Sequence, residues 1–414
     1  MIKNEMLMKQ LLFLALAVLS VPVSCEHVDH TGEINDPEAR IIPLEDVAKL
    51  LSALPIETDQ MTEVHDAVSS SDGNGYDEEY MMRDLLSVPG TGVGDEAMGK
   101  SMSTRSYSRP LKELIAEQLS IRTKSSDGSV LSPEEYLDAL EKSNMQIYWP
   151  YYRNWDGKEW PIVTFDPGNG AEANVGYRLF IDSEGNRKVE AVVVDEEMAA
   201  SHPVWVVNRN SDSGFTSMEV HRRKDPEWGT GGGSITVRPS SGLECAEVSA
   251  TAAAQKGAFR TLVLHDFKMR RNYDCWFAGA SEFFIKCGSV EDFTASTEAE
   301  LKLYSPRITD FMLVVKRSQM GKTIPMNVVL VSQWTDQLEN IAFMLTEDDG
   351  GTRTEWKCSA YVKIKSKSYG FEVALPFNSR DDIVWRGQLS APYLEKYDGV
   401  AGRFGDVELT FSLL

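Results

Sequence analysis

The sequence predicts an α+β protein built in series: an acidic N-terminal helical segment, a small domain rich in β-hairpins and a C-terminal antiparallel β-sandwich. Three observations support this fold class. Residues 43–145 show helical periodicity with helix start signals. Seven aromatic residues crowd into the stretch 146–165. Beyond residue 235, short apolar runs recur about every ten to twenty residues with turn residues between them, which is typical of an antiparallel sandwich.

Residues 1–24 have the pattern of an export signal. Lys3 and Lys9 give a basic start, Leu11 to Val18 is apolar but too short to span a bilayer, and a small residue precedes Cys25. This pattern resembles a bacterial lipoprotein signal, with Pro22 where Leu is usual, and the chain as a whole resembles exported surface lipoproteins of Bacteroidetes. The resemblance implies a lipid on Cys25 and an outer-membrane or cell-surface location. The alternative is an ordinary secretory signal.

The charge of the chain restricts its partners. The net charge is −21, and residues 26–100 hold 18 Asp and Glu against 4 Lys and Arg. Such a chain repels nucleic acid and anionic lipid, so we expect neither as a partner, and a membrane contact only through the lipid anchor. An extracellular glycan or protein is the expected partner.

Residues 25–42 are polar without periodicity and are expected to form a tether. Helices are expected next in the acidic region 43–145. Its last helix has the clearest start, since Ser132 is a favoured N-cap, Pro133 suits the first helical position and Glu135 completes a capping box. The other helices are predicted at 43–54, 61–68, 77–86 and 110–119.

The domain 146–228 is expected to be built on an aromatic hairpin. Asp156-Gly157 favours a two-residue type I′ turn, which would place Arg153 opposite Trp160. Flat aromatic rings beside polar groups hold sugars in many exported proteins, so Arg153, Trp155 and Trp160 at the turn end are candidate ligand-binding residues. The alternative is core packing, which we expect for three other aromatics of the stretch: Tyr148, Tyr152 and Phe165. Further strands are predicted at 175–181, 188–194 and 203–208.

The glycine-rich run 228–234 is expected to be a boundary, and 235–414 the sandwich domain. Strands are predicted at 259–265, 282–287, 311–315, 328–331, 341–345, 354–364, 371–375, 383–387 and 407–413. Cys245, Cys275, Cys287 and Cys358 form no CxxC pair, which argues against a zinc cluster. They are left as free thiols or as one or two disulfides.

Acidic residues around one inter-strand loop suggest a cation site. Asp266 ends a predicted strand, and Asp274 and Glu282 lie in a D-x-W-x-x-G-x-x-E pattern that resembles motifs of uncharacterised secreted bacterial β-sandwich domains. Hard carboxylate oxygens of this kind bind Ca²⁺, and residues 348–351 would join the site if the loops meet. The alternative is structural: Trp276 as a core anchor, with the acids paired to Arg270 and Arg271.

These observations favour a non-enzymatic surface lipoprotein that binds or scaffolds an extracellular glycan or peptide. We predict no catalytic residues, because none of the six histidines lies in a recognised metal or nucleophile motif. The competing class is a secreted hydrolase or an accessory subunit of one, since a catalytic triad assembles in space and not in sequence.

Overall fold

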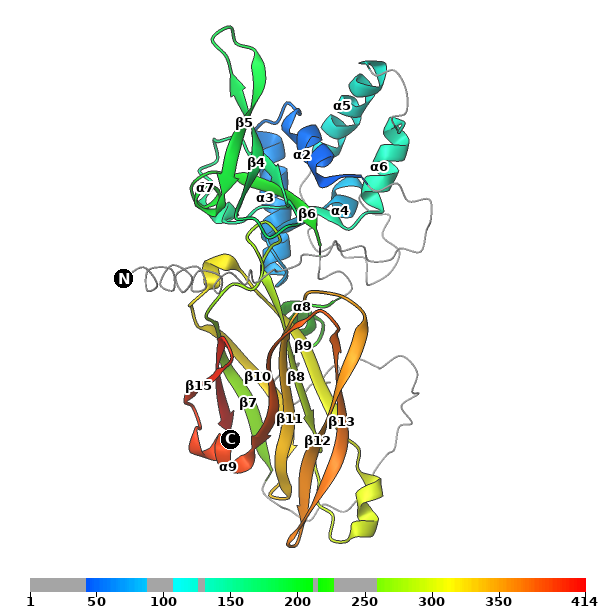
Figure 1. The fold of residues 1–414 in the computed structure, drawn as a ribbon, viewed down its shortest axis with the longest axis vertical. Coiled ribbons are helices and arrows are strands. Elements are labelled where there is room, and N and C mark those ends of the chain that lie inside the picture. The colour runs from blue at the N-terminus through cyan, green and yellow to red at the C-terminus, as the bar shows by residue number, and fades with distance from the viewer. Residues whose placement is uncertain (1–41, 88–106, 126–130, 211–214, 227–258) are drawn as a thin grey trace, which may run out of the picture.

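A computed structural model of the protein describes residues 42–87, 107–125, 131–210, 215–226 and 259–414. The tether, the export signal with Cys25, the glycine-rich run and Cys245 lie outside these residues. The fold is α+β, as predicted. Figure 1 shows two halves stacked along the long axis, helices around a mixed sheet in one and a β-sandwich in the other.

Helices cover one face of the mixed sheet of the N-terminal half. Their apolar residues share one hydrophobic core with the sheet, in which Leu50, Val64 and Ile115 meet Trp149 and Trp205. The capping box predicted at Ser132 and Glu135 is confirmed at the start of α6. The helices of this half are α2 (Leu44–Ser52), α3 (Thr58–Gly73), α4 (Met82–Leu86), α5 (Leu111–Ser125), α6 (Pro133–Glu141) and α7 (Glu196–Ser201). Helix α8 (Met218–Lys224) lies on the sandwich instead (Figure 1), and its Met218 belongs to the sandwich core.

The mixed sheet, sheet A, has the strand order β1-β2-β6-β3-β4-β5. Its strands are β1 (Glu79–Met81), β2 (Met145–Tyr148), β3 (Ile162–Phe165), β4 (Ala173–Ile181), β5 (Arg187–Asp195) and β6 (Val204–Arg209). All pairs are antiparallel except β3 with β6. The helix predicted over residues 77–86 is wrong in its first half, because β1 adds to the sheet there and only α4 is helical.

The aromatic stretch does not form the predicted hairpin. Strand β2 pairs with β1 and β6, and β3 pairs with β4 and β6, so the two sides of the expected hairpin never meet. Between them, Tyr151 adopts a left-handed conformation with φ 58°, and a 3-10 turn, η2 (Tyr152–Asn154), follows. Pro150 and Pro161 lack the amide hydrogens that a hairpin ladder needs. Because these two hydrogen-bond donors are missing, a loop is favoured over the type I′ hairpin.

The sandwich half contains all nine predicted strands. Sheet B has the order β13-β12-β11-β8-β9, with β14 also paired to β11, and sheet C has the order β10-β7-β16-β15. A large core lies between them, including Phe267, Phe283, Trp334 and Phe343. The strands are β7 (Arg260–Met269), β8 (Ser281–Ser289), β9 (Arg307–Val315), β10 (Ile324–Trp334), β11 (Leu338–Glu347), β12 (Arg353–Ile364), β13 (Lys367–Asn378), β14 (Asp382–Ser390), β15 (Ala401–Phe404) and β16 (Val407–Leu413).

Three short elements of this half were not predicted as helices: η3 (Glu298–Leu303), η4 (Arg317–Gln319) and α9 (Ala391–Lys396). Strand β15 was also not predicted. It covers only four residues, and its partner β16 supplies the pairing that defines it.

The loop between β7 and β8 joins the two halves. Its Trp276 and Phe277 are fully buried, and they pack on the second face of sheet A with Tyr148 and Val206. The indole N–H of Trp276 donates to the main-chain oxygen of Glu172 at 3.0 Å. The structural expectation for Trp276 as a core anchor is therefore confirmed, but the core it anchors belongs to the N-terminal half.

Ion pairs reinforce this joint between the halves. The buried carboxylate of Asp72, at the end of α3, pairs with Lys316 of the sandwich and with Arg153. Arg317 makes a two-point ion pair with Glu196, at 2.6 and 3.0 Å. Ion pairs therefore hold the two halves together in addition to the packing of Trp276 and Phe277.

Candidate functional site

The three aromatic-stretch residues predicted to bind ligand each have a protein partner. Arg153 pairs with Asp72, although it was expected to lie over Trp160. Arg187 lies over Trp160 in its place, 5.8 Å from the ring centroid. Trp155 is half-buried against the helical core, 5.5 Å from the ring of His65. The register that placed Arg153 opposite Trp160 is thus wrong, and a sugar platform on these residues stays a prediction.

The structure agrees more closely with the prediction that Tyr148, Tyr152 and Phe165 of the aromatic stretch are core residues. Tyr148 is 0% exposed and Tyr152 is 4% exposed. Phe165 is half-buried and packs against the same helical core. The hydroxyl of Tyr152 donates to Asp72 at 2.6 Å, so this ring is also part of the joint.

The predicted acidic residues are partly brought together. Carboxylate oxygens of Asp274, Glu282 and Glu347 lie within 4.8 Å of one another. Asp266 is not in this group, because it lies within β7 of sheet C, where its register partners are Pro325 and Thr410. The sequence prediction therefore had two of the three residues and missed Glu347, which ends β11 beside β8.

The loops expected to meet at this site do meet. The main-chain N–H of Asp348 donates to the main-chain oxygen of Glu282 at 3.0 Å. Burial raises the pKa of Asp274 to about 7. Burial and the Asp274 carboxylate raise the pKa of Glu347 well above its usual range. Pairing with the neighbouring arginines is wrong for these acids, since Arg270 pairs with Glu408 and Arg271 with Asp406.

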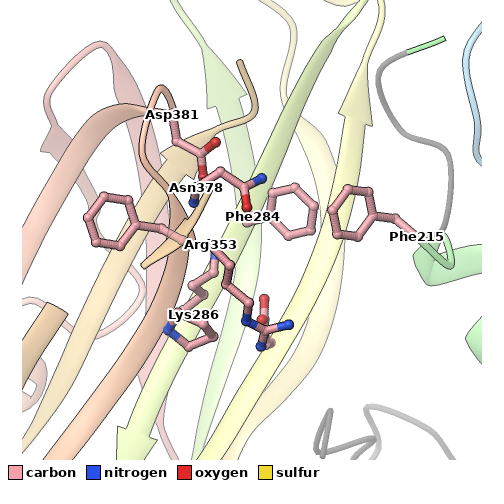
Figure 2. Close-up of a pocket in the computed structure, with 9 residues that line it drawn as sticks. Phe215, Phe284, Lys286, Arg353, Asn378 and Asp381 are labelled. Carbon is pink, nitrogen blue, oxygen red and sulfur yellow. The ribbon is translucent and has the colours of Figure 1, made fainter. Parts of the chain in front are cut away.

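A pocket of about 120 Å³ opens on the outer side of sheet B, where the sheet approaches the joint. Figure 2 shows the rings of Phe215 and Phe284 next to each other, with Lys286, Arg353, Asn378 and Asp381 gathered beside them. The two rings are 4.7 Å apart. The complete lining consists of Phe215, Phe284, Lys286, Asp310, Arg353, Pro376, Phe377, Asn378 and Asp381.

Two cations, Lys286 and Arg353, line the pocket together with the carboxyl groups of Asp310 and Asp381. Lys286 is 3% exposed, donates to the hydroxyl of Thr346 at 3.0 Å, and lies 4.4 Å from the centroid of the Phe284 ring. Arg353 is exposed, and neither a hydrogen bond nor an ion pair connects its guanidinium to any other residue that the structure describes. A guanidinium without a partner beside an apolar wall is available for an anionic group.

The acidic and amide groups of the pocket are held in place by short hydrogen bonds. The main-chain N–H of Asn378 donates to Asp381 at 2.8 Å, and the Asn378 side-chain amide donates to Asp348 at 2.9 Å. Burial, with the nearby Asp348 carboxylate, raises the pKa of Asp381 to about 7. In its protonated form, this carboxyl can donate as well as accept a hydrogen bond.

The sequence contains one feature that could have predicted this pocket. In FFIKC, Lys286 interrupts an otherwise apolar strand, and a lysine in a buried strand needs a functional or structural reason. Arg353 has no comparable signal, because it looks like an ordinary charged residue at a strand end.

The structure also places three of the cysteines and two of the histidines. Cys275, Cys287 and Cys358 are free thiols. The ring of His202 contacts the Glu159 carboxylate, and that of His265 contacts the amide of Asn327. Neither pair includes a serine or cysteine nucleophile. In the described parts of the chain, none of the helices has the length and hydropathy needed to cross a membrane.

No family model, curated protein or solved structure matches this chain significantly.

Proposed function

We propose that the protein is a non-catalytic, exported surface lipoprotein that binds the acidic end group of a glycan in the pocket on sheet B. One observation carries the proposal: the partner-free guanidinium of Arg353 and the buried ammonium of Lys286 share a pocket with aromatic rings. Arginine recognises carboxylates through two parallel hydrogen bonds, and aromatic faces stack on the C–H faces of sugars.

The remaining polar groups favour a sugar over a peptide. Asp310, Asn378 and Asp381 line the same pocket. Carboxyl and amide oxygens accept hydrogen bonds from hydroxyl groups, which a sugar offers in number and a peptide terminus does not. The cavity volume of about 120 Å³ is well below the roughly 300–1,000 Å³ of sites that enclose a whole small-molecule ligand. The pocket therefore suits one terminal sugar, with the rest of the chain outside.

The surface location rests on the start of the sequence. Lys3, Lys9 and the apolar run before Cys25 support export and lipidation at Cys25. A lipid there would hold the described fold at a membrane surface through the tether 25–42. Metabolic labelling with a fatty-acid probe, compared between the native chain and Cys25→Ala, tests this part separately from ligand binding.

Binding is tested on a glycan array that includes sugars with and without carboxylates. We expect the native protein to bind acidic sugars, and Arg353→Ala to bind them at least about tenfold more weakly. Arg386→Ala is the matched control, since Arg386 is an exposed arginine on neighbouring β14 that lies over Trp356, outside the pocket lining. Both variants should melt as the native protein does.

Two outcomes would overturn the proposal. The first is an array without an acidic-sugar signal. The second is Arg353-dependent binding of peptides with free C-terminal carboxylates and not of glycans, which would assign the pocket to a peptide.

One observation favours the competing hydrolase. Asp381, whose pKa is about 7, shares the pocket with a second carboxylate, Asp310. Acids with raised pKa values beside a second carboxylate serve as general acids in glycoside hydrolysis. Bound acidic oligosaccharides should be recovered intact by mass spectrometry if the protein only binds them. Shortened products that disappear in Asp381→Asn would establish the enzyme instead.

A further inference from the structure

Three carboxylates meet where the sandwich contacts sheet A, with Glu282 and Glu347 buried and Asp274 half-buried. Asp274 comes from the loop after β7, Glu282 from the start of β8 and Glu347 from the end of β11, and their oxygens lie within 4.8 Å of one another. Like charges at this separation repel strongly in a site with little water. Their convergence therefore needs a compensating positive charge or protons.

An independent observation points to a ligand. Glu347 is 1% exposed, and its Oε1 atom is buried without a hydrogen-bond partner. Buried carboxylate oxygens are nearly always satisfied by a donor or a cation, because leaving one bare forfeits its hydration. The Glu347 carboxylate that carries this oxygen belongs to the same group as Asp274 and Glu282.

Arg317, the arginine that binds the Asp274 backbone, does not supply the missing charge. Arg317 directs Nε and Nη2 to the Glu196 carboxylate, at 2.6 and 3.0 Å. Its Nη1 donates to the main-chain oxygen of Asp274 at 3.0 Å. The guanidinium thus positions the Asp274 backbone while its charge is matched by Glu196.

We propose that Asp274, Glu282 and Glu347 bind a calcium ion. The donor set is entirely carboxylate oxygen, which excludes a site of the zinc type with nitrogen or sulfur ligands. Calcium takes 6–8 oxygens at roughly 2.3–2.6 Å, so ligands on opposite sides of the ion are about 5 Å apart. The 4.8 Å limit on this group fits that span. Three carboxylates offer up to six oxygens, and water completes the shell.

The site differs from the one predicted from the sequence and implies a role for the ion. Glu347 takes the place of Asp266, and the ion ties β8 and β11 of the sandwich to the loop that carries Trp276. Trp276, two residues after Asp274, is buried on sheet A. Calcium would therefore fasten the sandwich to the N-terminal half, independently of what the pocket binds.

The test uses the full chain after removal of divalent ions with EDTA. Adding Ca²⁺ should raise the Tm by several degrees, whereas Mg²⁺ should not. Tb³⁺, a luminescent substitute for Ca²⁺, should emit when tryptophan is excited, because Trp276 is two residues from Asp274, and Ca²⁺ should quench this emission by displacement.

Variants distinguish binding from folding. Glu347→Gln should lose both the calcium shift and the Tb³⁺ emission. In EDTA it should melt at or above the Tm of the native protein, because an amide, unlike a carboxylate, can add no negative charge beside Asp274 and Glu282. Glu355→Gln, on the exposed part of β12, is the control and should respond as the native protein does. A native Tm that ignores Ca²⁺, an equal response to Mg²⁺, or a Glu347→Gln variant that keeps its response would each overturn the proposal.

Discussion

Replacing Trp276 by alanine should uncouple the two halves of the molecule. This ring belongs to the sandwich by sequence, yet it is 0% exposed and sits in the core formed with Tyr148 and Val206 of sheet A. It also stacks on Phe277, with ring centroids 3.9 Å apart. Removing it opens a cavity between the loop and sheet A and leaves the core of the sandwich in place.

The expected cost follows from the burial. A fully buried aromatic side chain removes roughly 150–250 Å² from water, which corresponds to about 4–6 kcal/mol at about 25 cal/mol per Å². Partial relaxation of the surroundings reduces this, and Trp→Ala changes in cores cost about 3–5 kcal/mol. The hydrogen bond from the indole to Glu172 is lost as well, so we expect a loss of about 3–5 kcal/mol in the free energy of unfolding.

Calorimetry and denaturant titration can measure this. The native protein should unfold in one cooperative transition, and Trp276→Ala should show two, with the sandwich transition close to its native position. Trp334→Ala is the matched control, because Trp334 is equally buried but lies in the sandwich core, so it should lower the sandwich transition itself. If Trp276→Ala keeps a single transition with a Tm shift below about 1 °C, the joint is not held by this ring.

Three further predictions concern the ion pairs, the loop geometry and the pH dependence. Asp72→Asn should lower the free energy of unfolding by about 3 kcal/mol, because it leaves the buried ammonium of Lys316 unpaired. Arg153→Ala removes the exposed partner of Asp72 and should lower it by less than about 1 kcal/mol. Equal losses in urea titrations would contradict the burial argument. Gly279→Ala should lower the Tm by several degrees, because φ is +137° and the added Cβ would lie 2.7 Å from the Asp77 carboxylate; an unchanged Tm would show that the loop adjusts. Burial raises the pKa of Glu63 from 4.5 to about 7, so the folded state holds this proton more tightly than the unfolded state, and its contribution to stability falls as pH rises from about 4.5 to about 7. Glu63→Gln should therefore flatten the fall of Tm over this range, and a pH profile identical to that of the native protein would disprove it.

The strands of the sandwich could be predicted because each carries its signal locally. In runs such as FFIKC, apolar residues that face the core are bounded by turn residues, and antiparallel neighbours extend them. The capping box at Ser132 is equally local. Such elements need no knowledge of the rest of the chain.

The hairpin prediction failed because its decisive contact is distant in sequence. Asp156-Gly157 favours a tight turn, but β6 inserts between β2 and β3 and takes the edges that the hairpin would have used. No local pattern shows that Val206 will lie beside Tyr148. The backbone departs from the predicted hairpin at Tyr151, which has a left-handed conformation with φ 58°.

The candidate sites divide in the same way, into residues that are close in sequence and residues that only the tertiary fold brings together. Asp274 and Glu282 were found because they are close in sequence, and Glu347 was missed because only the pairing of β11 with β8 brings it to them. The pocket unites residues of β8, β9, β12 and β13, with Asp381 in the turn that follows β13, and Phe215, which precedes α8. A site assembled from five segments becomes visible only when the strand order is known.

The position of β6 in the strand order of sheet A also determines when the N-terminal half can fold. Val206 pairs with Tyr148 on one side and with Thr164 on the other, so β2 and β3 belong to one sheet only after the six residues of β6 have arrived. Until then helices α2 to α6 have no complete sheet to cover, and their apolar faces stay open to water or to a chaperone. Long-range pairing of this kind is slow and prone to aggregation. For a chain that emerges from its N-terminal end, the first half should therefore mature late and in one step, and a polypeptide stalled before residue 204 should remain a substrate for proteases.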